Sequence, residues 1–437
     1  MTCPIREMQL ADEFGFNVIG NVSASTGLGV HARHVIELLI SKEHAVRVFD
    51  VNPGDGCHGH DHRFSDITAM NVADLIYGIN LFVLPPASIF SFLAANHEFC
   101  FGTNRLNAAI AMWELPKIPE HWLDGFRALD VILAASDFVK GVYERHISQS
   151  FIVPAPCPLF LPNNVKINRE AFGLPNAGPL FVSSFDPGSD HERKNPFAAI
   201  RAFIRAFENA GDARMVVKVN NPIRNGALHS SIQRLYEISR SHPNVLILDR
   251  VMSYPETLSL YSSCDVFVSL HRAEGLGLGL MEAMALGKPV IATAWSGNMS
   301  FMDHTNSCLV SYALVPVKSD LSVYKALNGM TQWAEPSEAD AMAWMQELGH
   351  NEILRKQIGL AANEAMRKYQ TNAQQGHFIN ELQAIREHRN FLPYKKIPSP
   401  ASLWNAARRK TPSPVATFAR AASRQWNNRI GWRLSKK

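Results

Sequence analysis

The sequence has little of what marks a secreted or membrane-spanning protein. Only six cysteines occur in 437 residues, and their spacing indicates no disulfide framework. The first residues, Met1–Glu13, carry acidic side chains and no apolar run, unlike a secretory signal. The most apolar window, Leu75–Ala95, includes Asn80 and two prolines, whereas a membrane-spanning helix needs about 20 predominantly apolar residues. We therefore expect a cytoplasmic chain with reduced cysteines.

Metal-binding patterns are also scarce. The segment Cys57–His62 contains one cysteine, three histidines and one aspartate. No second cluster elsewhere in the sequence completes a ligand set, and side chains at alternate positions of a loop suit solvation equally well. We therefore predict no metal site.

Charged residues make up only 19% of the chain, and they are distributed unevenly. From Phe391 onward there are eleven lysines and arginines and no acidic residue. Removing these eleven charges from the net charge of +4 leaves −7 for residues 1–390. The body is therefore mildly acidic and the tail strongly basic. We expect no nucleic-acid partner.

At 437 residues the chain is too long for one ordinary hydrophobic core, so two or three domains are expected. The first half alternates strands with helices, beginning with strand Phe16–Gly20, helix Val30–Ile40 and strand Ala45–Asp50. Further strands are predicted at 79–84, 106–112 and 130–135. The proline-dense segment Val153–Pro162 is interpreted as an interdomain linker.

The second half continues the same alternation. Strands are predicted at 179–185, 215–219, 245–248, 265–270 and 289–293, and helices from 196 and at 255–261, 280–286, 351–369 and 374–388. Ser337 is predicted to begin another helix, with Asp340 at capping-box spacing. The four residues before it, Trp333–Pro336, are interpreted as a loop.

A glycine string near the start imitates a dinucleotide-binding fingerprint. Gly27 and Gly29 open a G-x-G-x-x-A string, and Asp50 lies 21 residues past Gly29. Six residues separate Gly20 from Gly27, whereas that fingerprint starts directly at the end of the strand. A nicotinamide site, a loop facing another ligand and a plain helix start are therefore all left open.

The stretch Asp265–Phe301 has the composition of a ligand-binding unit. Three glycines lie between two glutamates, Glu274 and Glu282, and the second glutamate lies in the predicted helix that follows the glycines. Glycines let the backbone approach a ligand, a helix N-terminus suits a diphosphate, and carboxylates accept hydrogen bonds from hydroxyl pairs. The pattern indicates a nucleotide or sugar-nucleotide site. An ordinary strand–helix–strand crossover with surface glutamates is the alternative.

The segment Glu274–Glu282, followed within this stretch by Ser296-Gly297-Asn298, resembles the Glu–seven residues–Glu motif of retaining glycosyltransferases of the GT-B fold, glycosyltransferase family 4 (group 1). Further blocks between Gly15 and Pro336 fit the same family. The resemblance implies two Rossmann-like, doubly wound α/β domains facing a cleft. We place an acceptor-side domain at 1–160, a donor-side domain at 161–373, a helix returning to the first domain at 374–390 and a basic tail at 391–437.

The resemblance also implies roles for individual residues. Glu274 would position the donor hexose, and Glu282 would accept hydrogen bonds from the ribose. Lys194 and the loop would stabilise the leaving diphosphate, the loop residues being Gly275, Leu276, Gly277, Leu278 and Gly279. The family's arginine near Ser184 is absent, so we expect Arg193 to replace it, although a solvated Arg193-Lys194 pair is the alternative.

Two further loops are assigned through the same resemblance. The loop containing Arg250 and Val251 is expected to pack against the nucleotide base, and the loop containing Gly27 and Gly29 to face donor phosphate and acceptor. A departure occurs at Trp113 and Glu114, where many members place a histidine and a subset carries the same Trp-Glu-Leu-Pro block. Glu114 is expected either to contact a substrate or act as a base, or to cap the following segment.

The activity implied is the retaining transfer of a hexose from a nucleotide-sugar donor to a hydroxyl of a glycan or lipid-linked acceptor, in polysaccharide or glycolipid synthesis. The chain has no Asp-x-Asp motif, so we expect no cofactor and no metal dependence. A nucleotide-sugar epimerase of the same architecture and a non-catalytic sugar-nucleotide-binding protein are the alternatives.

The prolines at 393, 398 and 400 lead us to interpret the start of the basic tail as a linker. The rest of the tail carries its own pattern. Apolar residues recur every three or four positions on one side of a predicted helix, namely Val415, Phe418, Ala422, Trp426 and Ile430, with arginines around them. This pattern is typical of an interfacial helix, so we expect the tail to hold the protein peripherally on the anionic inner face of a membrane. Packing on the acidic body, or a tail without specific contacts, would be the alternatives.

Overall fold

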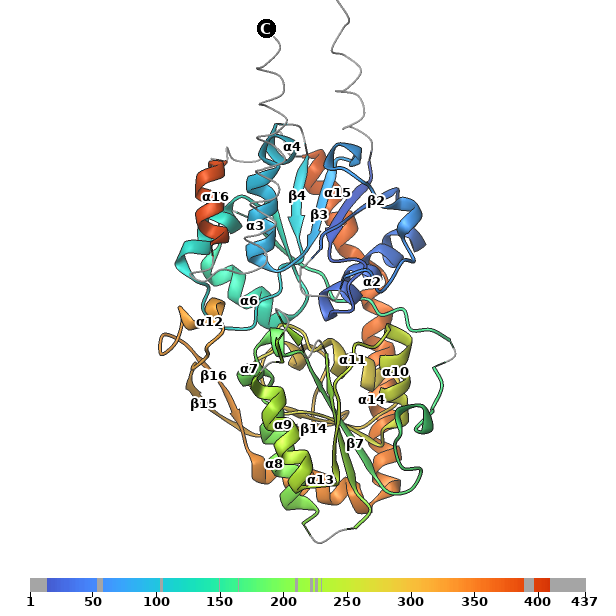
Figure 1. Ribbon diagram of the computed structural model, residues 1–437. Helices are drawn as coiled ribbons and strands as arrows, with labels where there is room; N and C mark the ends of the chain where they lie inside the picture. Colours follow the sequence, from blue (N-terminus) through green and yellow to red (C-terminus); the bar gives the residue numbers. More distant parts are fainter. Residues whose placement is uncertain are drawn as a thin grey trace, which may run out of the picture.

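The computed structural model describes residues 14–52, 58–102, 105–148, 150–163, 165–208, 211–220, 223–224, 227–228, 230–388 and 397–408. These residues form two lobes stacked on one another, each built on a parallel sheet with helices on its faces (Figure 1). Two doubly wound α/β domains facing each other were expected from the sequence, and the architecture confirms this.

The first domain contains a six-stranded sheet of order β2-β1-β3-β4-β5-β6, in which every pairing is parallel. Its strands are β1 (Phe16–Gly20), β2 (Val46–Asp50), β3 (Ile79–Val83), β4 (Leu106–Ala109), β5 (Val131–Ala134) and β6 (Phe151–Pro154). Its helices are α2 (Gly27–Ser41), α3 (Pro86–Ala95), α4 (His97–Phe101), α5 (Leu123–Arg127) and α6 (Asp137–His146). The central strands are buried along their whole length, because helices cover both faces of the sheet.

The second domain repeats this plan with the strand order β11-β8-β7-β12-β13-β14. Its strands are β7 (Leu180–Phe185), β8 (Arg214–Val219), β11 (Val245–Leu248), β12 (Val266–Ser269), β13 (Val290–Thr293) and β14 (Cys308–Val310). Its helices include α7 (His191–Lys194), α8 (Pro196–Ala206), α9 (Ser230–Ser241), α10 (Tyr254–Ser263), α11 (Leu278–Ala285) and α13 (Glu338–His350). A short hairpin, β9 (Ile223–Arg224) and β10 (Ala227–Leu228), follows β8.

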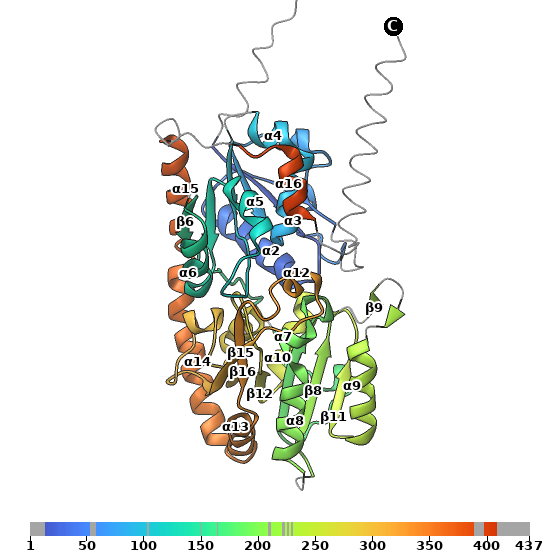
Figure 2. The same ribbon diagram turned by 90° about the vertical axis from the view of Figure 1, so that its left-hand side faces the viewer.

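Two long helices near the end of the chain connect the domains. Helix α14 (Glu352–Ala373) packs against α11, and α15 (His377–Glu387) buries Phe378, Ile379 and Leu382 in the core of the first domain. Figure 2 shows the two helices in line along one side of both lobes. Across the described residues, no helix combines the length and apolarity needed to cross a membrane.

The predicted linker Val153–Pro162 is wrong at its start. Val153 and Pro154 belong to β6, which is the edge strand of the first sheet. A proline lacks the N–H that a ladder needs, and an edge strand tolerates this loss because one of its sides has no partner strand. The proline density therefore concealed a strand.

The predicted loop Trp333–Pro336 is also wrong. These residues form most of β16 (Gln332–Pro336), which pairs antiparallel with β15 (Tyr312–Pro316). The two strands and the short helix α12 (Ser322–Lys325) between them make an extension of the second domain, which we call the strap. Trp333 and Tyr324 of the strap are buried in one core cluster with Trp113 of the first domain. The strap therefore joins the two domains.

The predicted linker at the start of the basic tail is wrong for the described residues 397–408. Pro400 is the first residue of helix α16 (Pro400–Ala407), and the Ser399 side chain caps it by accepting a hydrogen bond from the Ser402 N–H. The helix packs against α3 and α5 and buries Leu403 and Ala406. Residues up to 408 are therefore part of the first domain, while the apolar stripe predicted from Val415 onward lies outside the described residues.

Candidate active site

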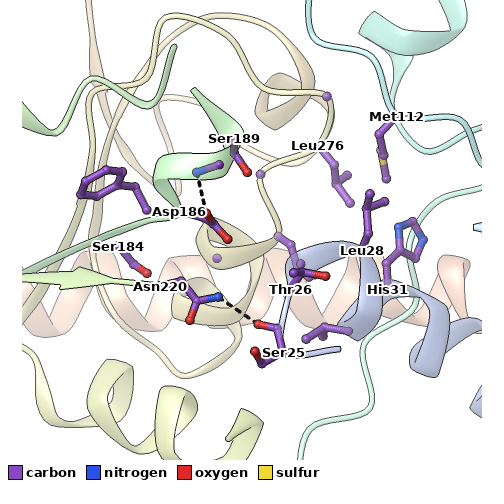
Figure 3. Close-up of a pocket in the computed structure, with 18 of the residues that line it drawn as sticks. Ser25, Thr26, Leu28, His31, Met112, Ser184, Asp186, Ser189, Asn220 and Leu276 are labelled. Carbon is purple, nitrogen blue, oxygen red and sulfur yellow. Dashed lines mark hydrogen bonds between the residues drawn. The ribbon is translucent and has the colours of Figure 1, made fainter. Parts of the chain in front are cut away.

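A cavity of about 450 Å³ lies between the carboxyl ends of the two sheets and is lined by both domains. Figure 3 shows side chains of the first domain, among them Thr26, Leu28 and His31, facing those of the second, among them Ser184 and Leu276. Asn220 donates a hydrogen bond to the Ser25 carbonyl across the gap, at 3.0 Å (Figure 3). The size and position of the cavity are those of a ligand site in an open α/β fold.

Glu274 is the centre of a charged cluster at one end of this cavity. Its carboxylate lies 2.5 Å from the Lys194 Nζ and 3.2 Å from the Arg193 Nη1. The Glu274 N–H donates to the Ser296 Oγ at 2.8 Å, which fixes the backbone beside the cavity. Burial opposes ionisation of Glu274, but the charges of Lys194 and Arg193 outweigh it and lower its pKa to about 2. Glu274 is therefore an ionised acceptor in the cavity wall.

Arg193 has a different setting from its neighbour Lys194. Only 3% of Arg193 is exposed, and its guanidinium donates to the carbonyls of Ala273 and Ser189 at 2.7 and 3.2 Å. It also lies 3.7 Å from the Glu114 carboxylate. Because the guanidinium of Arg193 is directed at oxygens of the protein, Arg193 holds the site together. The ammonium of Lys194 is more exposed and is the more accessible cation.

Glu282 lies at the other end of the same loop and helix. It is buried, lines the cavity and interacts with the Tyr254 hydroxyl through a side-chain hydrogen bond. Burial raises the pKa of Glu282 to about 8, although Tyr254, Lys218 and Arg33 favour its ionised form. The surroundings of Glu282 thus favour its protonated form at neutral pH.

The loop between the two glutamates leads directly into α11. Gly277 adopts a φ of +93° at the N-cap of this helix, a conformation that glycine reaches without strain. No side chain caps the helix, and all five loop residues from Gly275 to Gly279 line the cavity. Backbone N–H groups and the positive end of the helix dipole therefore face the space between Glu274 and Glu282.

The glycines of the first domain divide into two roles. A Cβ at Gly27 would meet no atom within 4 Å, and Gly27 lines the cavity. A Cβ at Gly29 would lie 2.3 Å from the Ala24 carbonyl oxygen, so this glycine permits the turn before α2 to pack closely. Asp50 accepts a hydrogen bond from the Ser23 N–H and does not line the cavity, so nothing in this arrangement favours a nicotinamide site.

Glu114 faces the cavity beneath the strap. Its carboxylate accepts a hydrogen bond from the Tyr324 hydroxyl at 2.6 Å. The Trp113 indole is buried and contacts the Tyr324 ring, with ring centroids 5.5 Å apart. Glu114 therefore joins a strap residue to Arg193, which is a contact between domains that neither of the two roles expected from the sequence describes.

Arg250 and Val251 are not among the described residues that line the cavity. The Arg250 guanidinium lies 5.8 Å from the centre of the Phe172 ring, and Val251 is 37% exposed. The next residue, Met252, lines the cavity instead. Any contact of this loop with a base would thus involve Met252 first.

The histidine-rich segment holds the first domain together. His58 lies 3.0 Å from the Ser23 hydroxyl and 3.6 Å from the Asp50 carboxylate, and Asp61 pairs with Arg33. Over the described part of the chain, no group of three or more histidines, cysteines and acids is arranged to hold a metal ion.

Lys218 is a cavity residue that the sequence reasoning missed. It lies in β8 opposite Ser184 of β7, is only 4% exposed and donates to the Asn220 amide oxygen at 2.8 Å. Ser184 is where the family resemblance expects an arginine nearby, so a cation on the neighbouring strand enters the same region. A lysine near the end of an otherwise apolar strand, MVVKV, was the available signal.

Part of the chain that forms this site is similar to a family of known proteins. Residues 180–328 match the family described as Glycosyl transferases group 1, and the match contains the Lys194 and Glu274–Glu282 cluster. This part of the chain, within the second domain, is therefore similar to the group 1 glycosyltransferases.

Solved structures show that most of the chain has the GT-B fold. Sucrose-phosphate synthase from Thermosynechococcus elongatus aligns with a TM-score of 0.61 and 15% identity, over 85% of this chain and 100% of that one. A trehalose-phosphate synthase (UDP-forming) from Burkholderia vietnamiensis aligns with a TM-score of 0.56 and 13% identity, over 85% of this chain and 99% of that one. HepE from Anabaena, in complex with UDP and glucose, aligns with a TM-score of 0.54 and 15% identity, over 87% of this chain and 100% of that one. No curated protein matches the sequence.

Proposed function

We propose that this protein is a retaining hexosyltransferase that transfers a sugar from a nucleotide-sugar donor to a hydroxyl of a glycan or lipid-linked acceptor. The observation that carries the proposal is the pair Lys194–Glu274, which faces Glu282 across the uncapped start of α11 within one cavity. A nucleotide sugar has a diol at each end of a diphosphate. One glutamate for each diol, with N–H groups and a lysine between them, matches that order of groups.

The chemistry then follows from charge. The bond between the sugar C1 and the diphosphate oxygen breaks, and the acceptor oxygen forms a bond to C1 on the same face. The acceptor proton passes to the departing phosphate oxygen. Negative charge grows on that phosphate, so cations and N–H groups near it accelerate the step. Lys194, Lys218 and the backbone of Gly277–Gly279 are the groups we assign to this task, and Arg193 is assigned to holding Glu274 and Glu114.

For the donor we propose a uridine diphosphate sugar. One similar structure contains UDP and glucose, and another is named as a UDP-forming enzyme. The test is a thermal-shift comparison of UDP, GDP, ADP and dTDP, followed by the corresponding nucleotide sugars and by analysis of the released diphosphate. Stabilisation by UDP and release of UDP from a UDP-hexose in the presence of glycan acceptors are expected. Absence of both would refute the proposal.

Excess chelator should leave the rate unchanged, because lysines face the region assigned to the diphosphate. Loss of activity in chelator with recovery in Mg²⁺ or Mn²⁺ would show that these groups are insufficient.

The proposed setting is polysaccharide or glycolipid synthesis at the inner face of a membrane, where residues 409–437 would bind anionic lipid. Co-sedimentation of the full chain and of a chain ending at residue 408 with anionic and neutral vesicles tests this. Equal sedimentation would refute it.

A further inference from the structure

His31 lies in the first turns of α2, on the first-domain wall of the cavity. Figure 3 shows its imidazole beside Leu28 and Met112, with Leu276 of the second domain opposite. Leu276 belongs to the loop that follows Glu274. The imidazole therefore faces the end of the cavity where the sugar of a donor and the acceptor would meet.

The side chain is buried without a polar partner. Only 2% of His31 is exposed, and within the described residues neither its Nδ1 nor its Nε2 has a hydrogen-bond partner. An unsatisfied buried polar atom destabilises a fold, and a leucine or phenylalanine would fill this position without that penalty. Two unsatisfied nitrogens that line a cavity indicate that something which enters the cavity supplies their partners.

The chemistry of the imidazole narrows the partner. Burial, with a further contribution from His34, lowers the pKa of His31 to about 3, so the ring is neutral at physiological pH. A neutral imidazole offers one N–H donor and one lone pair. A hydroxyl group can satisfy either of them, whereas a phosphate would prefer the lysines on the opposite wall.

We propose that His31 hydrogen-bonds a sugar hydroxyl in the cavity and thereby takes part in selecting the sugar. The proposal rests on the function proposed above, in which the cavity binds a nucleotide sugar. The hydroxyl belongs either to the hexose of the donor or to the acceptor, and binding measurements distinguish the two.

The experiment compares His31→Phe and His31→Gln with the unaltered protein, using UDP and UDP-glucose as probes in calorimetry. If the donor sugar is the partner, His31→Phe should weaken UDP-glucose by about three- to tenfold, the value of one neutral hydrogen bond, and leave UDP unchanged. If the acceptor is the partner, both affinities stay the same. Transfer to methyl hexosides then falls by a similar factor, while hydrolysis of UDP-glucose continues.

Two further measurements separate this role from a structural one. His31→Phe should raise the melting temperature by a few degrees, because it removes an unsatisfied polar group, and His31→Gln should recover most of the lost affinity or transfer. His44→Phe is the matched control, since His44 lies in the same domain among the rings of Phe14 and Phe16 and does not line the cavity.

The failures are distinguishable. Unchanged binding and unchanged transfer in His31→Phe would overturn the role of His31 alone. A lower melting temperature together with equal weakening of UDP and UDP-glucose would assign His31 a structural role and also overturn the proposal. An unaltered protein that binds neither UDP nor any nucleotide sugar would refute the proposed function itself, and this inference with it.

Discussion

The two ends of one short segment, Glu274 and Glu282, show how differently a fold can treat the same side chain. Both carboxyls are buried in one cavity wall, eight residues apart. Two cations within 3.2 Å hold Glu274 ionised, whereas Glu282 faces a tyrosine hydroxyl and has its pKa raised by burial. The contrast shows that the neighbours supplied by other elements, rather than the residue type, decide the charge of a buried carboxyl.

The largest expected effect is on stability at the Glu274 end. Glu274→Gln leaves the charges of Arg193 and Lys194 without their carboxylate, which we expect to lower the free energy of unfolding by about 3 kcal/mol. Because the pKa of Glu274 is lowered, its contribution is complete above about pH 4.5 and is lost as the pH falls towards 2. Urea unfolding at pH 7 measures the change. Glu282→Gln is the matched control, and an equal loss in both variants would contradict the comparison.

Next in size is the rate effect of Lys194→Ala. Loss of one donor to a developing negative charge slows a reaction by about 10²–10³-fold. We expect this loss in the turnover number for release of UDP from a UDP-hexose. Lys356→Ala changes an exposed lysine that pairs with Glu352 and should leave the rate unchanged. A loss of turnover below about tenfold would show that Lys218 and the backbone N–H groups, rather than Lys194, stabilise the phosphate.

At the Glu282 end the expected effect depends on pH. The raised pKa means that the protonated group stabilises the fold fully below about pH 4.5, and that this contribution decreases as the pH rises to about 8. The slope relative to Glu282→Gln should reach at most ~1.4 kcal/mol per pH unit. Unfolding titrations of both proteins between pH 5 and pH 8.5 measure it. Parallel curves would show that Glu282 is ionised throughout.

Ligand binding sharpens the same contrast. If ribose hydroxyls donate to the ionised carboxylate, UDP affinity should rise with pH between about 6 and 8, by at most tenfold per unit. Glu282→Gln removes this rise and retains whatever dependence comes from the titration of UDP itself. A pH dependence that survives in the variant would exclude Glu282 as its source.

The smallest expected effect concerns the strap. Tyr324→Phe removes the hydroxyl that donates to Glu114 at 2.6 Å, and a hydrogen bond to a carboxylate is worth about 1.5 kcal/mol or more. We expect a loss of stability of that order with unchanged UDP affinity, since Tyr324 does not line the cavity. Weaker UDP binding in this variant would show that the strap also shapes the donor site.

Features set by neighbouring residues were predictable from the sequence. The glycines between Glu274 and Glu282 precede α11 as expected, and Ser337 caps α13 through the Asp340 N–H. The strand alternation predicted both parallel sheets, because covered parallel strands form continuous apolar runs. Errors arose where a local pattern had two explanations. The prolines at 154 and 400 lie at an edge strand and a helix start, and Trp333 lies in a strand where its partner, Val315, is 18 residues earlier.

The sequence by itself therefore determined most of the elements, the two-domain architecture and the segment that carries the two glutamates, since these depend mainly on contacts within a few residues. Only the tertiary structure decided what surrounds the glutamates. Lys218 enters the cavity from β8, and Tyr324 reaches Glu114 from the strap. The imidazole of His31 in α2 has no hydrogen-bond partner among the described residues. The physical reason is that burial and electrostatic field at a site are sums over elements distant in sequence, and no local pattern contains them.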